Sequence, residues 1–218
     1  MSDKKGITYL FVDIGGVLLT DGWSHESSKL AAKKFGLNFK ELNKRHAEAL
    51  GAYELGKLTM GEFLSLVVFC EKQPFTQAQF LKFLFAQSKS YPEMIELIRK
   101  LKAKYGLKII VVSNEGHELN AYRIRKFKLN EFVDSFISSC FVHISKPDAD
   151  IFRLALDITQ ARPRQVVYIE NTMMFVQIAE SLGIRTILHT DYSSTCAKLA
   201  SLGLQIDEGR QQQTQTEL

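Results

Sequence analysis

The stretch YLFVDIGGVLLT, Tyr9 to Thr20, is an apolar run that contains one charged residue, Asp13, followed after one residue by two glycines. The run predicts a buried strand over residues 7–14. Burial disfavours the charged form of a carboxylate, so an aspartate at the end of such a strand indicates that its charge is used there. The glycines predict a tight turn whose backbone amides suit an anion.

The composition is that of a globular protein. The chain has 218 residues, 45% hydrophobic and 24% charged, enough for one sizeable core and a smaller additional unit. Its net charge of +4 is spread through helical patterns, which favours small anionic ligands over nucleic acid. The three cysteines are far apart, as is typical of reduced thiols. We find no pattern of a signal peptide or a membrane-spanning helix, and therefore expect a cytoplasmic protein without a membrane partner. No pattern indicates an oligomeric state.

Two kinds of pattern divide the chain. Residues 21–88 show helical periodicity only and predict a helical insertion, in which Thr59 and Glu62 form a capping box. Strand and helix patterns then alternate, which predicts a doubly wound α/β domain with a parallel sheet, formed by residues 1–20 and 89–204. The polar segment 205–218 predicts a disordered tail. Further strands are expected at 108–114, 133–139, 165–170 and 185–190, and the last helix at about 193–202.

Polar residues stand where the predicted strands end. In an open parallel sheet the ligand site lies outside the carboxyl ends of the strands. Acids, a hydroxyl and a lysine are therefore expected to converge at one edge of the sheet. These residues are Asp13, Ser113, Asn114, Glu170 and Asn171, together with Lys146 in the segment SKPDADIF at 145–152.

Each of these residues also has a structural interpretation. Asp13 could be a turn residue, and Ser113 or Asn114 could cap a helix. Lys146 alone could be a solvated side chain, and Glu170 and Asn171 could form an ordinary turn between a strand and a helix. The five histidines show no metal-ligand spacing, which favours structural or surface roles. Residues 173–175, MMF, are expected to pack rather than to bind.

Four motifs in order carry a resemblance to a known family. The chain resembles the haloacid dehalogenase-like (HAD) hydrolases, and within them the helical-cap branch that includes sugar-phosphate phosphatases and the phosphatase domain of soluble epoxide hydrolase. The resemblance covers about residues 7–203 and implies a HAD-like Rossmannoid core with a small helical cap inserted after the first strand. The motifs are DIGGVL at 13–18, VVSN at 111–114, SKPDADIF at 145–152 and VVYIENTMMFVQIAESLGI at 166–184, and the cap contributes YELGKLTMGEF at 53–63.

The resemblance implies a role for each candidate residue. Asp13 would be the nucleophile that attacks phosphorus and forms an aspartyl-phosphate. Lys146 would balance charge on the nucleophile and on the transferring group. The substrate would be bound by Gly15, Gly16, Ser113 and Asn114. The cofactor Mg²⁺ would be bound by Asp13, Gly15, Glu170 and Asn171.

The chain departs from the family pattern at two places. Many family phosphatases carry a second aspartate two residues after the nucleophile, where this chain has Gly15. Loss of general acid–base help typically costs ~10²–10⁴-fold in rate. The segment IEN at 169–171 replaces two adjacent aspartates with Glu170 and Asn171, which predicts weaker Mg²⁺ binding.

The sequence thus favours a Mg²⁺-dependent phosphomonoester hydrolase that acts on a small phosphorylated metabolite, slowed by the missing second aspartate. One alternative is a weak or inactive relative that binds a phosphorylated ligand or a protein partner. A third is a metal-free haloacid dehalogenase in which Asp13 attacks carbon, which fits Gly15 but not the acid at Glu170. Cap residues such as Trp23 and Tyr53 would select the substrate.

Overall fold

A five-stranded parallel sheet forms the centre of the computed structural model, which describes residues 6–206. The strand order is β3-β2-β1-β4-β5, so β1 lies in the middle and the chain proceeds outward from it in both directions. Ligands of such sheets bind at the carboxyl ends of the strands, where the strand order reverses. The strands are β1 (Tyr9–Val12), β2 (Lys108–Ser113), β3 (Ser135–Ser138), β4 (Val166–Glu170) and β5 (Arg185–Leu188).

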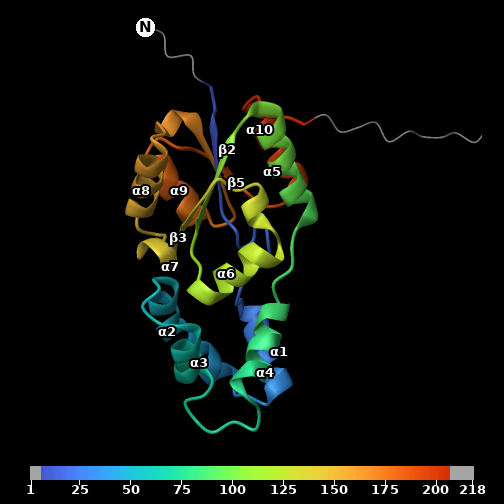
Figure 1. Ribbon diagram of the computed structural model, residues 1–218, viewed down its shortest axis with the longest axis vertical. Coiled ribbons are helices and arrows are strands. Elements are labelled where there is room, and N and C mark those ends of the chain that lie inside the picture. Colours follow the sequence, from blue (N-terminus) through green and yellow to red (C-terminus); the bar gives the residue numbers. More distant parts are fainter. Residues whose placement is uncertain (1–5, 207–218) are drawn as a thin grey trace, which may run out of the picture.

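Helices cover both faces of the sheet (Figure 1). Alternate residues of β1 point to opposite faces: Leu10 and Val12 join the hydrophobic cluster under α5, whereas Phe11 joins Phe152 of α8 in a second cluster. The predicted doubly wound α/β core is therefore confirmed. Its helices are α5 (Pro92–Tyr105), α6 (His117–Lys126), α7 (Ser139–Val142), α8 (Asp150–Thr159), α9 (Met173–Ser181) and α10 (Tyr192–Ser201), with short 3-10 turns η1 (Leu129–Glu131) and η2 (Pro163–Gln165).

Four further helices form a separate layer beyond the carboxyl ends of the strands (Figure 1). Their hydrophobic cluster includes Phe63 and Phe80 and extends to Leu119 of α6. The predicted capping box of Thr59 and Glu62 is present at the start of α3. All four lie within the predicted insertion at 21–88: α1 (His25–Phe35), α2 (Phe39–Glu54), α3 (Met60–Val67) and α4 (Gln77–Ala86).

Some local predictions were wrong. The strand expected at 133–139 ends at Ser138 because the chain turns directly into α7, and the strand expected at 185–190 ends at Leu188. Met173 and Met174 do not pack: their exposed fractions are 52% and 56%, since the first turn of α9 faces solvent.

The ends of the described chain add little to the site. Gln205 is held by hydrogen bonds of its backbone to the Tyr105 hydroxyl, while residues 207–218 of the predicted tail lie outside the described residues. The cysteines at 70, 140 and 196 are free thiols. Within residues 6–206, the helices are too short or too polar to cross a membrane.

Candidate active site

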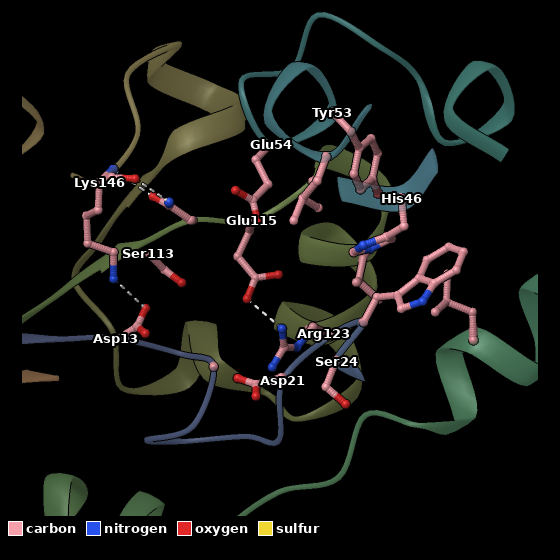
Figure 2. Close-up of a pocket in the computed structure, with 18 of the residues that line it drawn as sticks. Asp13, Asp21, Ser24, His46, Tyr53, Glu54, Ser113, Glu115, Arg123 and Lys146 are labelled. Carbon is pink, nitrogen blue, oxygen red and sulfur yellow. Dashed lines mark hydrogen bonds and ion pairs between the residues drawn. The ribbon is translucent and has the colours of Figure 1, made fainter. Parts of the chain in front are cut away.

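A cavity of 360 Å³ lies between the carboxyl ends of the strands and the helical layer. Figure 2 shows its two sides. Asp13 and Ser113 line it from the ends of β1 and β2, Lys146 lines it from the loop between α7 and α8, and His46 and Tyr53 line it from α2. The structure thus brings the predicted nucleophile, lysine and hydroxyl together at one place.

The turn after β1 closes on itself. The Asp13 amide donates to the Ile169 carbonyl of β4 (3.0 Å), which fixes the strand end, and the Gly16 amide donates to the Leu19 carbonyl (2.7 Å). The expectation that the Gly16 amide is offered to a ligand is therefore contradicted, because this amide is used within the turn. Gly16 has a positive φ of 72°, and a Cβ there would lie 2.1 Å from the Asn171 amide, so only glycine fits.

Lys146 is the centre of a buried charge cluster. Its Nζ lies 3.1 Å from Asp13 Oδ1 and 2.7 Å from Glu170 Oε2, and it donates to the Tyr168 hydroxyl (3.1 Å). Burial alone would lower the pKa of Lys146, but Asp13 and Glu170 raise it above its ordinary value. Lys146 is therefore a fixed cation beside the Asp13 carboxylate.

The two residues at the end of β2 have different roles. Asn114 clamps the Lys146 loop: its side-chain NH₂ donates to the Lys146 carbonyl (2.8 Å), and its side-chain oxygen accepts from the Lys146 amide (2.9 Å). The Asn114 amide group thus positions Lys146 instead of facing a ligand. Ser113 is buried and lines the cavity (Figure 2).

The Asn171 side chain lies close to oxygens of two other predicted metal ligands, Gly15 and Glu170. In one orientation of its amide, the Asn171 oxygen lies 2.9 Å from Glu170 Oε1 and 3.2 Å from the Gly15 carbonyl; in the reverse orientation the NH₂ donates to both. Neighbouring oxygens around an octahedral Mg²⁺ are about 3 Å apart. In the first orientation the Gly15 carbonyl and the Asn171 oxygen are therefore spaced as two ligands of a hard cation would be, and Asp13 lines the same cavity.

Glu170 fits such a cation less well. Its Oε2 is taken by Lys146 and by the Tyr168 hydroxyl, and its Oε1 accepts from the Thr172 amide (2.9 Å). Glu170 is fully buried, and its main contact is with Lys146, which it holds in place. In residues 6–206, groups of three or more His, Cys, Asp or Glu side chains suited to a metal are absent; the oxygens beside Asp13 include a carbonyl and an amide.

The helical wall of the cavity is aromatic. Tyr53 stacks on Phe63 at 4.6 Å, and a Cβ on Gly116 would lie 1.8 Å from the Tyr53 ring, so glycine is needed there. His46 packs against Trp23 at 4.7 Å, and burial lowers the pKa of His46 to about 4. Trp23 and Tyr53 both line the cavity, as expected.

Three cavity carboxyls were missed by the sequence reasoning. Glu115 forms a buried ion pair with Arg123 (2.5 Å). Burial and the nearby Glu115 raise the pKa of Glu54 to about 7, and partial burial and Asp13 raise the pKa of Asp21. Glu115 directly follows the VVSN motif and Asp21 ends the first apolar run, so an acid next to a motif was the available signal.

The comparisons with known proteins agree with this geometry. A family model described as haloacid dehalogenase-like hydrolase matches residues 7–183. The chain belongs to this family. The HAD-like hydrolase is 26% identical to bifunctional epoxide hydrolase 2 of Sus scrofa over 217 residues, covering 89% of this chain and 38% of that protein. It is 26% identical to (S)-2-haloacid dehalogenase 4A of Burkholderia cepacia over 103 residues, covering 47% of this chain and 44% of that protein.

A solved structure supports the same fold. A HAD family enzyme of Bacteroides thetaiotaomicron, in complex with magnesium and inorganic phosphate, matches with a TM-score of 0.73 and 20% identity, covering 87% of this chain and 99% of that one. The matched part of each of the two curated relatives spans less than half of that protein's length.

Proposed function

We propose that this HAD-like hydrolase is a Mg²⁺-dependent phosphomonoester hydrolase that works through an aspartyl-phosphate on Asp13. One observation carries the proposal: the Asp13 carboxylate lines the cavity at the end of the central strand and is paired with the buried Lys146. A carboxylate attacks phosphorus in its ionised form, and the Lys146 cation lies 3.1 Å from Asp13 Oδ1. The phosphate-bound structure from B. thetaiotaomicron supports the reaction class.

Each sheet-side residue has a task in this reaction. An Asp13 oxygen forms a bond to phosphorus while the ester P–O bond breaks. Lys146 offsets the charge on Asp13 and then on the transferring group, where positioning and electrostatics account for most of the catalysis. The Ser113 hydroxyl donates to a phosphoryl oxygen, and Asn114 holds Lys146 in register.

The metal would be held by Asp13, the Gly15 carbonyl and Asn171, with Glu170 behind them. When bound, Mg²⁺ supplies positive charge that neutralises phosphoryl oxygens. The convergence of oxygens at Asn171 supports this ligand set, and so does the magnesium in the B. thetaiotaomicron complex.

The substrate in this proposal is a small phosphorylated metabolite. A cavity of 360 Å³ is near the lower end for small-molecule sites. The organic half of the substrate would face Trp23, His46 and Tyr53. These residues belong to the segment 21–88, which forms the proposed cap. A cytoplasmic location belongs to the same proposal and agrees with the free cysteines.

A haloacid dehalogenase is the second candidate, and Gly15 favours it. Attack of Asp13 on carbon forms an ester and expels a halide, which needs no proton, so the missing second aspartate would not slow that step; water must then hydrolyse the ester to release Asp13. The charge cluster of Lys146 and Glu170 and the oxygens at Asn171 favour phosphate and metal instead.

A panel of phosphomonoesters, with Mg²⁺ or with a chelator, tests the proposal. We expect Mg²⁺-dependent phosphate release by the parent and a loss of ~10³-fold or more in Asp13→Asn, with an unchanged circular dichroism spectrum. Asp157→Asn, an exposed aspartate of α8, is the control and should act like the parent. Chloride release from 2-chloropropionate in chelator would instead identify a dehalogenase, and tight phosphate-ester binding without turnover a binding protein.

A further inference from the structure

In the loop after the nucleophile, the Asp21 carboxyl lies next to Gly15, on the side where another residue would carry its side chain. A Cβ on Gly15 would stand 3.1 Å from Asp21 Oδ1 and 3.9 Å from the Asp21 Cα. Gly15 has no positive φ within the left-handed region, so its backbone would accept another residue. The space beside position 15 is therefore occupied by the carboxyl of Asp21.

The fold holds Asp21 there through its neighbours. Residues 15 and 19 form a parallel bridge, which bends the loop back on itself. The Thr20 amide donates to the Lys89 carbonyl (2.9 Å), and its hydroxyl donates to the Gln87 carbonyl (3.0 Å). Arg123 donates to the Thr20 carbonyl from the other side. Asp21 thus follows a residue that is tied to two separate parts of the chain.

The Asp21 carboxyl is available for chemistry. It lines the same cavity as Asp13 and Lys146 (Figure 2), and it also lines a second cavity of 570 Å³ that contains Asn171. Within residues 6–206, its oxygens take part in no hydrogen bond or ion pair. The neighbouring Arg123 is already used by Glu115 and by the Thr20 carbonyl.

The other two carboxyls of the cavity are placed less well for the reacting atoms. Glu115 is buried and paired with Arg123 at 2.5 Å. Glu54 comes from the end of α2, on the cap side of the cavity (Figure 2). Asp21 is the acid that belongs to the same loop as the nucleophile and contacts its turn.

We propose that Asp21 is a catalytic residue of this site, the proton carrier that takes the place of a side chain at position 15. The inference rests on the proposed phosphatase reaction and on the position of Asp21. An Asp13 oxygen bonds to phosphorus, the ester P–O bond breaks, and its electron pair goes to the leaving oxygen, which takes the proton of the Asp21 carboxyl. A water oxygen then bonds to phosphorus, its proton goes to the Asp21 carboxylate, and the bond from phosphorus to Asp13 breaks with its electron pair returning to Asp13.

Two esters of different leaving-group acidity test this role. An alkyl phosphate releases a basic alkoxide that needs a proton, whereas p-nitrophenyl phosphate releases a stable anion that does not. Asp21→Asn keeps the shape of the side chain. We expect kcat/KM to fall ~10²–10⁴-fold with the alkyl phosphate and much less with p-nitrophenyl phosphate. Phosphoenzyme should also accumulate in the variant, because the water-attack step has lost its proton acceptor.

Moving the carboxyl provides a positive test. Gly15→Asp/Asp21→Ala places an acid on the neighbouring residue and removes the group it would collide with. It should exceed Gly15→Ala/Asp21→Ala, the matched control without the carboxyl, at least tenfold in kcat/KM for the alkyl phosphate. Melting curves of all variants show that each is folded.

Three outcomes separate the two proposals. If Asp21→Asn slows both esters equally, or if the relocated carboxyl restores nothing in a folded protein, Asp21 is structural and only this inference is overturned. If the parent releases phosphate from neither ester in Mg²⁺, the phosphatase reaction itself is overturned. An ester-dependent loss together with restoration by Gly15→Asp supports both.

Discussion

The sheet side and the cap side of the cavity differ in whether their polar side chains have hydrogen-bond or ion-pair partners. On the sheet side, Lys146 is paired with both Asp13 and Glu170, and Asn114 clamps its backbone. On the cap side, the His46 Nε2 lacks a hydrogen-bond partner within residues 6–206, and the Glu54 side chain forms no ion pair in that range. The charge cluster of the sheet side is therefore paired before a ligand binds, whereas these two polar groups of the cap side are not.

This difference separates chemistry from recognition. A paired charge cluster keeps its geometry without a ligand, which is what a preorganised catalytic site requires. A buried polar group without a partner costs about 1–3 kcal/mol, and a ligand that bonds to it recovers that cost. The sheet side thus suits a fixed reaction, and the cap side suits recognition of a variable organic group.

The largest expected effect comes from removing the charge of Lys146 from the paired cluster on the sheet side. Lys146→Met keeps most of the apolar side chain but removes its charge, which leaves the buried Asp13 and Glu170 carboxylates without their shared cation. We expect kcat and kcat/KM to fall together by ~10²–10³-fold, and unfolding to become easier by about 3–5 kcal/mol, the usual cost of breaking a buried ion pair. Kinetics at several substrate concentrations and melting curves measure both.

Lys29→Met is the matched control. Lys29 pairs with Glu26 at 2.8 Å on the surface, with 49% of its side chain exposed, so its loss should cost no more than about 1 kcal/mol. A higher KM with unchanged kcat in Lys146→Met would mean that the lysine only anchors the phosphate.

On the cap side, we expect a smaller effect of Glu54 on stability, and one that depends on pH. Its folded pKa of about 7 lies above the ordinary value of 4.5, so between these pH values the folded protein keeps a proton that the unfolded chain has lost. Stability contributed by this proton is therefore lost as the pH rises through 7. Glu54→Gln removes the loss and should unfold less easily than the parent at pH 8, by roughly 1–3 kcal/mol, and nearly equally at about pH 4, below both pKa values.

Melting curves in chelator across this range test the expectation. Glu48→Gln, on the exposed side of the same helix, is the control, and its difference from the parent should not change with pH. If Glu54→Gln shows no pH-dependent gain, Glu54 has a partner or solvent contact that offsets its neighbours Glu115 and Asp13.

The same comparison explains what the sequence could and could not reveal. Asp13 and Lys146 were predictable because strand ends of a parallel sheet meet at one edge, and because motifs in order fix which residues stand there. The bond of the Gly16 amide to Leu19 and the clamp of Asn114 on Lys146 were not, since both depend on backbone positions brought together by the fold. The place of Asp21 beside Gly15 depends on how the loop bends back, which no spacing encodes.

The smallest expected effect concerns Asn171 and tests whether its side-chain oxygen faces a metal. Its oxygen lies 3.2 Å from the Gly15 carbonyl in one amide orientation, and Asn171→Asp adds a negative charge there with almost no change in volume. With Mg²⁺ bound, the attraction should outweigh the added repulsion from Asp13, and without metal the repulsion should dominate.

We therefore expect Asn171→Asp to need several-fold less Mg²⁺ for half-saturation, to gain more thermal stability from Mg²⁺ than the parent does, and to be less stable than the parent in chelator. Calorimetric titration with Mg²⁺, together with melting curves, measures all three. Asn130→Asp, an exposed residue of η1, adds the same charge elsewhere and should leave the affinity unchanged. Equal or weaker Mg²⁺ binding in Asn171→Asp would show that the Asn171 amide donates to the Gly15 carbonyl and to Glu170 instead of offering its oxygen to a metal. The polar groups around Asn171 would then have their partners without a metal.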